Sequence, residues 1–263
     1  MSKKHTSVLA ALLLFVTSAC QSDLPSVGNP RGEPLLPDLM PAPPTDFSTS
    51  LEEDGRNVLR FSSILVNVGQ GNFILRGTRS FDQWTAEQLV EHTESGAVAI
   101  QMPASVVWGG DGHEHWHIGA VAHYWIIPLG PNGEPVDDQM IDETGGMTDS
   151  KVGFCFYDHT RLLENGPAEP IFQSSSCGGQ DDREFFMGLS PGWSDKYLWE
   201  LPGQQIDITD LPMGKYRMWT EADPNSWFTE ATRDNNVTWA DFELSEFSGG
   251  RKTALIYATG PES

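Results

Sequence analysis

The chain has 263 residues, of which 38% are hydrophobic, so it is long enough to bury a core as one large domain or two small ones. It carries 16 Lys and Arg residues against 37 Asp and Glu residues, which gives a formal net charge of -21. This charge argues against nucleic acid and against an anionic membrane surface as electrostatic partners, and it favours a cationic partner. Solubility alone is the alternative explanation of so much acid.

The N-terminal twenty residues have the pattern of an export signal. Two lysines precede an apolar run over residues 8–16, which is too short to span a membrane, and Cys20 follows small residues. This ending resembles a bacterial lipobox, so we expect a lipoprotein-type signal peptide at residues 1–20 and a lipid anchor on Cys20. The protein would then be an exported cell-envelope lipoprotein of the outer membrane or cell surface. Ordinary cleavage near Ala19, which would release a soluble protein, is the alternative.

A proline-rich stretch comes next, with little apolar periodicity. Residues 21–35 therefore suit a linker between an anchor and a domain. We expect one domain over residues 36–247 and a C-terminal tail over residues 248–263.

Five segments within the expected domain are short and rich in β-branched or aromatic residues, and glycine and proline separate them. They are residues 58–68, 97–101, 124–127, 216–220 and 237–244. This pattern is typical of a mainly β fold with a β-sandwich core and long loops, and not of a parallel α/β sheet. Only the segment Trp84–His92 reads as a helix.

Three histidines stand at alternate positions, His113, His115 and His117. Neutral imidazole suits a transition metal, with copper or zinc leading. On an extended strand the three would share one face, and Glu114 and Trp116 would point the other way. The outer two backbones of a straight strand would lie ~13 Å apart, so we expect a bend or a bulge here. A surface strand with incidental histidines is the alternative.

Cys155 and Cys177 form an even pair if Cys20 carries lipid. In an oxidising compartment we expect them to form a disulfide, which would close a loop of about twenty residues and contribute roughly 3 kcal/mol. Two free thiols, or a thiolate metal ligand, are the alternatives.

A series of short motifs follows in one order along the chain. They are Leu36–Leu39, Val58–Phe61, Asn67–Gly69, His113–His117, Lys151–Cys155, Gly188–Gly192, Asp195–Tyr197, Gln205–Asp210 and Glu230–Asn236. Histidines followed by Lys-x-x-Phe-Cys and then by Gly-Leu-Ser-Pro-Gly are hard to reach by chance. In this order the motifs resemble the catalytic domain of the lysyl oxidase family.

The resemblance implies a copper-dependent amine oxidase, with copper bound by His113, His115 and His117. It also implies an organic cofactor, lysine tyrosylquinone, made from the side chains of Lys151 and Tyr197. Such an enzyme converts primary amines, peptidyl lysine among them, to aldehydes with O2 and releases NH3 and H2O2. An acidic surface suits a cationic amine substrate or a lysine-containing protein substrate.

Asp195 stands two residues before Tyr197 and is the candidate for the base that removes a proton from the substrate. A turn carboxylate that accepts backbone N–H groups is the alternative. A lone lysine is usually a solvated charge and a lone tyrosine a half-buried anchor, so the roles of Lys151 and Tyr197 come from the resemblance.

One departure from the family pattern lies near Tyr197. Animal members carry a disulfide there, at the positions where this chain has Trp193 and Gly203. Both cysteines are missing together, so we expect the packing of Trp193 and Trp199 to hold this loop instead.

Two other functions compete with an amine oxidase. A non-catalytic envelope β-sandwich lipoprotein could bind copper or zinc for structure, storage or adhesion, but it would not need the pair Lys151 and Tyr197. A zinc hydrolase would need a carboxylate base near the histidines, and Glu114 points away from them on a strand.

Overall fold

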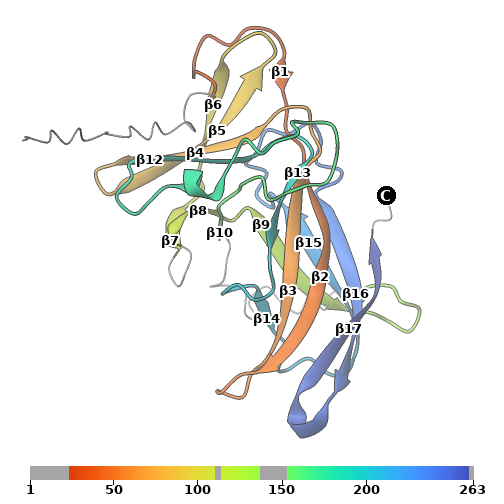
Figure 1. Ribbon diagram of the computed structural model, residues 1–263. Coiled ribbons are helices and arrows are strands. Elements are labelled where there is room, and N and C mark those ends of the chain that lie inside the picture. Colours follow the sequence, from red (N-terminus) through yellow and green to blue (C-terminus); the bar gives the residue numbers. More distant parts are fainter. Residues whose placement is uncertain (1–23, 110–113, 137–152, 261–263) are drawn as a thin grey trace, which may run out of the picture.

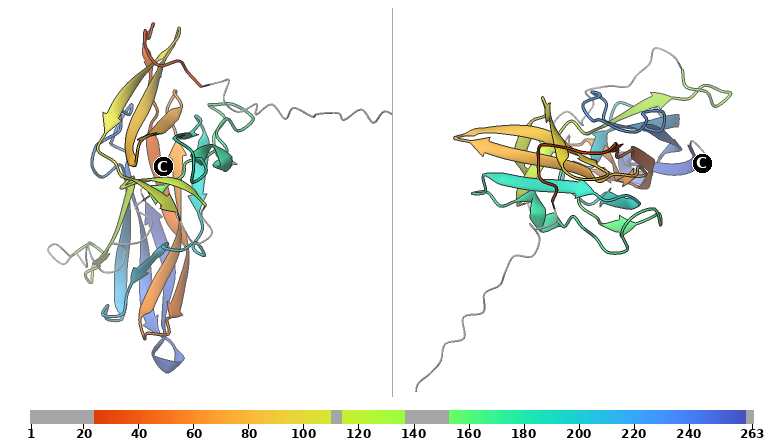
Figure 2. Two further views of the ribbon diagram at one scale, coloured as in Figure 1. Left: turned by 90° about the vertical axis from the view of Figure 1, so that its left-hand side faces the viewer. Right: turned by 90° about the horizontal axis from the view of Figure 1, so that it is seen from above.

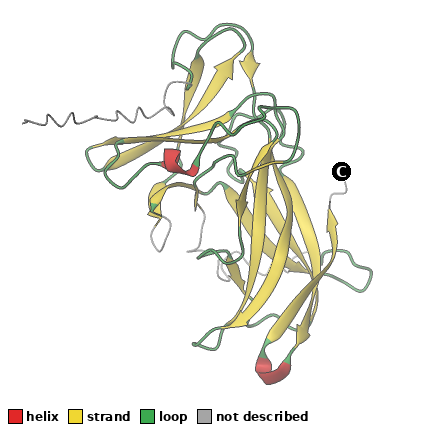
Figure 3. Ribbon diagram, in the orientation of Figure 1, coloured by secondary structure: helices red, strands yellow, loops and turns green. Residues whose placement is uncertain are grey.

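The computed structural model describes residues 24–109, 114–136 and 153–260 (Figures 1 and 2). Strands dominate these ranges, so the predicted mainly β class is confirmed (Figure 3). Within them, the strands pair antiparallel into four sheets. No helix in the described ranges is long and apolar enough to cross a membrane.

Two of the sheets build an elongated sandwich (Figure 1). The first contains β2 (Leu39–Leu51), β3 (Asn57–Asn67), β11 (Thr160–Arg161), β13 (Trp193–Tyr197) and β14 (Gln205–Asp207). The second contains β9 (Ala122–Pro128), β15 (Gly214–Ala222), β16 (Val237–Glu246) and β17 (Lys252–Gly260), and η2 (Ser248–Gly250) joins the last two strands.

Aromatic side chains fill the space between these two sheets. The rings of Phe47 and Phe242 are 5.2 Å apart, and those of Phe61 and Tyr124 are 5.0 Å apart. Phe61 and Phe242 are fully buried, so these contacts belong to the core. The sandwich core is therefore the one that the aromatic strand segments predict.

The other two sheets adjoin the sandwich (Figures 1 and 2). The larger contains β1 (Pro34–Leu35), β4 (Phe73–Ser80), β5 (Gln83–His92), β6 (Ala97–Met102) and β12 (Glu184–Leu189). The smaller contains β7 (Val106–Gly109), β8 (His115–Gly119) and β10 (Gly153–Phe154). One continuous cluster of buried apolar side chains runs through all four sheets. The short helix η1 (Ser174–Cys177) lies in the long connection between β10 and β12.

The predicted helix at Trp84–His92 is wrong, because this segment is strand β5. Its Ala, Glu, Gln and Leu residues are strong helix formers. However, β5 pairs with both β4 and β6, and its alternate residues Ala86, Gln88 and Val90 are buried. Pairing on both sides overrides the local propensity.

The ends of the described chain also take part in sheets. β1 pairs with β5 near the end of the expected linker, and β17 pairs with β16 within the expected tail. The expected signal peptide, including Cys20, lies outside the described residues, and the domain boundaries stay predictions.

A buried ammonium fastens the last strand to the sandwich. Lys252 is 7% exposed, and its Nζ donates to the carbonyls of Ile208, Thr209 and Leu211 at 2.6, 2.7 and 2.6 Å. These bonds satisfy a cation that burial would otherwise penalise.

A buried carboxylate connects two motifs that are far apart in the sequence. Glu230 accepts hydrogen bonds from Leu39 N at 2.7 Å and from Asn236 Nδ2 at 3.1 Å, and its side chain is fully buried. Asn235 donates to Asp38 at 3.0 Å beside it. The start of β2 is thereby held against the loop between β15 and β16. Burial raises the pKa of the Glu230 carboxyl to about 7, although these hydrogen bonds and Arg233 oppose the shift.

The contribution of Glu230 to stability should depend on pH. Its carboxyl has a higher pKa in the folded state, about 7, than its ordinary value of 4.5, so the folded protein binds this proton more tightly. The contribution is complete below about pH 4.5 and is lost as the pH rises through about 7, by up to roughly 3 kcal/mol. Urea unfolding of the wild type and of Glu230→Gln at about pH 5 and pH 8 tests this.

The difference in unfolding free energy between wild type and Glu230→Gln should shrink from the lower to the higher pH. Glu243→Gln, at an exposed position of β16, is the control and should show no such change. An equal difference at both pH values would contradict the titration of Glu230.

Candidate functional site

Strand β8 carries two of the three histidines. His115 and His117 stand two residues apart, and their ring centroids are 4.9 Å apart. His117 is 5% exposed, and His115 is half-buried. The two imidazoles therefore lie side by side, which suits a metal that prefers nitrogen ligands. His113 lies outside the described residues, and no group of three potential ligands occurs among the described His, Cys, Asp and Glu residues.

The other face of β8 is packed with aromatic rings. Trp116 lies 4.6 Å from Trp84 and 5.1 Å from Trp108, measured between ring centroids. Its Nε1 donates to Gly179 O at 2.9 Å. Glu114 precedes the strand and is exposed. Trp116 thus anchors the strand, and the alternation that the sequence predicts holds for His115, Trp116 and His117.

Strand β10 lies directly beside β8. Gly153 pairs with Gly119, and Phe154 pairs with Ile118. A Cβ added to Gly153 would come within 2.9 Å of the Cβ of His117, so this close approach requires glycine. Lys151 lies outside the described residues, two positions before Gly153.

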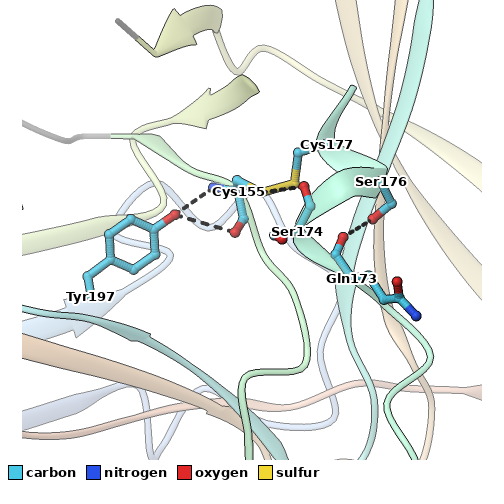
Figure 4. The surroundings of a disulfide bond; sticks show 6 residues. All are labelled: Cys155, Gln173, Ser174, Ser176, Cys177 and Tyr197. Carbon is cyan, nitrogen blue, oxygen red and sulfur yellow. Dashed lines mark hydrogen bonds between the residues drawn. A yellow bond between two sulfur atoms is a disulfide. The ribbon is translucent and has the colours of Figure 1, made fainter. Parts of the chain in front are cut away.

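Tyr197 reaches this pair of strands from β13 (Figure 4). Its hydroxyl accepts a hydrogen bond from Cys155 N at 2.8 Å and lies 3.4 Å from Cys155 O, to which it donates. Its ring packs edge-on against Phe154 with 4.4 Å between the centroids. Because Phe154 pairs with the neighbour of His117, the fold brings Tyr197 to the strand beside the histidines.

Asp195 lies in the middle of β13, on the same face of the strand as Tyr197 and 1% exposed. It pairs with Leu65 of β3, so it is a strand residue, and the alternative of a turn carboxylate is wrong.

The surroundings of the Tyr197 hydroxyl favour its protonated form. Burial, followed by the charge of Asp195, raises the pKa of Tyr197 well above its ordinary value, although the hydrogen bond from Cys155 N acts in the opposite direction. Burial and then Asp195 likewise raise the pKa of Tyr157. Asp195 thus lies within electrostatic reach of more than one phenol.

A disulfide joins Cys155 to Cys177, as the sequence predicts (Figure 4). Both cysteines are fully buried, and their Cα atoms are 5.9 Å apart. The bond connects the backbone that holds the Tyr197 hydroxyl to the helix η1. Near Tyr197, the side chain of Trp193 is 7% exposed, and its Nε1 donates to Pro167 O at 2.9 Å.

Sequence reasoning missed Asp158, which organises the connection between β10 and β12. Its carboxylate accepts hydrogen bonds from Ile171 N, Phe172 N and Ser190 N at 2.8, 3.1 and 2.8 Å. Ser190 belongs to the motif Gly-Leu-Ser-Pro-Gly. In the sequence, the available signal for the role of Asp158 was an acidic residue shortly after Cys155. Tyr157, the residue before Asp158, gave no signal in the sequence.

Comparison with known proteins finds similarity to lysyl oxidases. A family model described as lysyl oxidase matches residues 147–250. Lysyl oxidase homolog 2 of Gallus gallus is 27% identical over 191 residues, which is 72% of this chain and 19% of that protein. The chain is thus similar to lysyl oxidases.

Other lysyl oxidase relatives give similar figures. Lysyl oxidase homolog 2 of Homo sapiens is 27% identical over 183 residues, 69% of this chain and 18% of that protein. Protein-lysine 6-oxidase of Gallus gallus is 28% identical over 103 residues, 35% of this chain and 24% of that protein. The matches thus span about a fifth of the length of the curated relatives. The lysyl oxidase model covers the positions of Lys151, Asp195 and Tyr197, whereas the three histidines precede its match.

Loss of the disulfide should destabilise the protein. Its cysteines are 22 residues apart, and closing such a loop contributes about 3 kcal/mol. The double variant Cys155→Ala/Cys177→Ala should lose about that much unfolding free energy in urea.

The wild type reduced with a phosphine should match this double variant, and the reductant should leave the variant unchanged. Unfolding midpoints that are the same for oxidised and reduced wild type would overturn the stabilising role of this bond.

Proposed function

We propose that this protein is a copper-dependent amine oxidase that converts primary amines, including lysine side chains of proteins, to aldehydes with O2 and releases NH3 and H2O2. The observation that carries the proposal is the position of Tyr197, whose hydroxyl is held at the backbone of Cys155, directly after the strand β10 that pairs with the histidine strand β8. Residues 36–247 would form the catalytic domain.

In this proposal His113, His115 and His117 bind the copper ion. The described imidazoles of His115 and His117, 4.9 Å apart between centroids, fit such a site. Lys151 and Tyr197 would form the lysine tyrosylquinone, and this cofactor with its copper supplies the redox chemistry and a carbonyl that accepts amines.

The remaining residues prepare the site for this reaction. The hydrogen bond from Cys155 N fixes the Tyr197 hydroxyl, and Phe154 limits the movement of its ring. Asp195 lies on the same face of β13 and is buried, so it is our candidate for the base that removes a proton from the bound amine. Burial of these groups also keeps bulk water away from the reacting atoms.

Substrate and location follow from charge and covalent chemistry. A net charge of -21 attracts amines, which are cationic, and the name protein-lysine 6-oxidase of one relative agrees with a lysine substrate. The disulfide suits an oxidising compartment, so we propose that the protein is exported. A lipid anchor at Cys20, in the outer membrane or at the cell surface, remains part of this proposal.

Phenylhydrazine tests for the quinone. Copper-loaded, aerated protein should acquire a visible hydrazone band with phenylhydrazine, and Tyr197→Phe should not, because it lacks the oxygen from which the quinone is made. Absorption spectra before and after the reagent provide the measurement.

Tyr216→Phe is the matched control, since Tyr216 is also buried and its hydroxyl also donates to a backbone carbonyl, that of Pro212, at 2.7 Å. It should keep the band. Bound copper without any hydrazone band in the wild type would instead favour the non-catalytic metal-binding sandwich.

Copper binding can be tested without turnover. His117→Ala should weaken Cu²⁺ binding by at least roughly 100-fold, because loss of a group that merely supports a ligand already costs up to about that much. Competition with a chelator of known affinity gives the constant. His159→Ala, at an exposed position, should bind copper as the wild type does. Equal affinities for His117→Ala and the wild type would remove His117 from the site.

A further inference from the structure

A groove of about 830 Å³ is lined in part by residues of η1 and its neighbours. Its walls come from β4 and β12, from the segment 169–178 and from Leu24 and Pro25. The groove is amphipathic, because it combines aromatic and aliphatic side chains with carboxylates.

The apolar part of the groove lies partly open to solvent. Phe172 and Phe185 are buried beneath it, whereas Ile171 is 43% exposed and Phe186 is half-buried. An apolar side chain of a ligand could therefore pack on Ile171 and Phe186 and gain about 25 cal/mol for each Å² removed from water.

Four carboxylates line the same groove, Glu91, Glu169, Asp182 and Glu184, and the described lining contains no lysine or arginine. Two of them already accept hydrogen bonds within the protein: Glu91 accepts from Asn72 Nδ2, and Asp182 accepts from Gly179 N, both at 2.7 Å. Glu169 is exposed, and the side chain of Glu184 is 44% exposed with Arg76 only at 4.0 Å. These last two can therefore pair with a cation from outside.

The wall of this groove is fastened to the candidate site. Cys177 ends η1 and is bonded to Cys155, whose N–H holds the Tyr197 hydroxyl (Figure 4). Two residues further on, Gly179 O accepts the indole N–H of Trp116, which lies between the two described histidines. The disulfide and these hydrogen bonds thus connect the wall of the groove to the candidate site.

We propose that this groove is a docking subsite for an extended cationic segment of a lysine-containing polypeptide, whose reacting lysine enters the candidate site. The inference rests on the proposed function and adds a second recognition point to it. Basic side chains of the segment pair with Glu169 and Glu184, and apolar ones pack on Ile171 and Phe186. A second copy of this chain is disfavoured, because its net charge of -21 would repel the carboxylates.

A binding experiment tests the subsite without turnover. The full-length Tyr197→Phe protein would be titrated into a fluorescent peptide of alternating lysine and leucine, and anisotropy would be recorded. In this background Glu169→Gln/Glu184→Gln should raise the Kd roughly tenfold, because two ion pairs are lost. Glu164→Gln/Glu243→Gln removes the same charge at exposed positions outside the groove and should leave the Kd within about twofold.

Equal effects of the two double variants would overturn the proposal, since net charge alone would then explain peptide binding. A variant of the apolar wall sharpens the test: Ile171→Asp should also weaken binding of the lysine-leucine peptide, because the apolar contact is lost. If it strengthens binding instead, the contact is electrostatic only, and docking of an amphipathic segment is wrong.

Turnover separates the subsite from the proposed function. With copper-loaded enzyme, the ratio of kcat/KM for the peptide to that for butylamine should fall roughly tenfold in Glu169→Gln/Glu184→Gln, through KM. An unchanged ratio would overturn the subsite while leaving the amine oxidase in place. If wild-type enzyme oxidises neither amine, the proposed function fails, and the anisotropy experiment alone decides whether the groove binds the peptide.

Discussion

The candidate site depends on one hydrogen bond, from the backbone N–H of Cys155 to the hydroxyl of Tyr197. It joins residues that are 42 positions apart, and both partners are buried. A buried N–H without an acceptor costs about 1–3 kcal/mol, so the strand β13 and the segment after β10 stabilise each other's position. The disulfide extends this connection to η1, and the pairing of β10 with β8 extends it to His117.

Much of the sandwich could be predicted because its strands carry their own signal. The aromatic and β-branched segments became β3, β6, β9, β15 and β16 at nearly the predicted bounds. The helix prediction for Trp84–His92 failed because its residue types favour a helix locally. Only the position of this segment between β4 and β6 makes it a strand. Pairing with distant neighbours leaves no mark on a short window of sequence.

In the candidate site, too, some features could be predicted from the sequence and others could not. The alternation of His115, Trp116 and His117 follows from strand periodicity, and the cysteine pair was deduced from parity and compartment. The approach of Tyr197 to Cys155 could be expected only from the family resemblance, because no spacing in the sequence relates the two. Asp158 and Glu230 were not assigned structural roles for a related reason. A carboxylate that accepts backbone N–H groups looks the same in sequence as one that faces water.

The packing of Trp116 among Trp84, Trp108 and the Gly179 carbonyl has a consequence for strand register. Successive side chains of a strand face opposite ways, so slippage of β8 by one residue would bring an indole to the position of the imidazoles. It would also move His117 away from Gly153, whose missing side chain leaves room for it. The bulk of one indole therefore helps to decide which donor atoms this strand presents, although the indole itself has no lone pair to offer a metal.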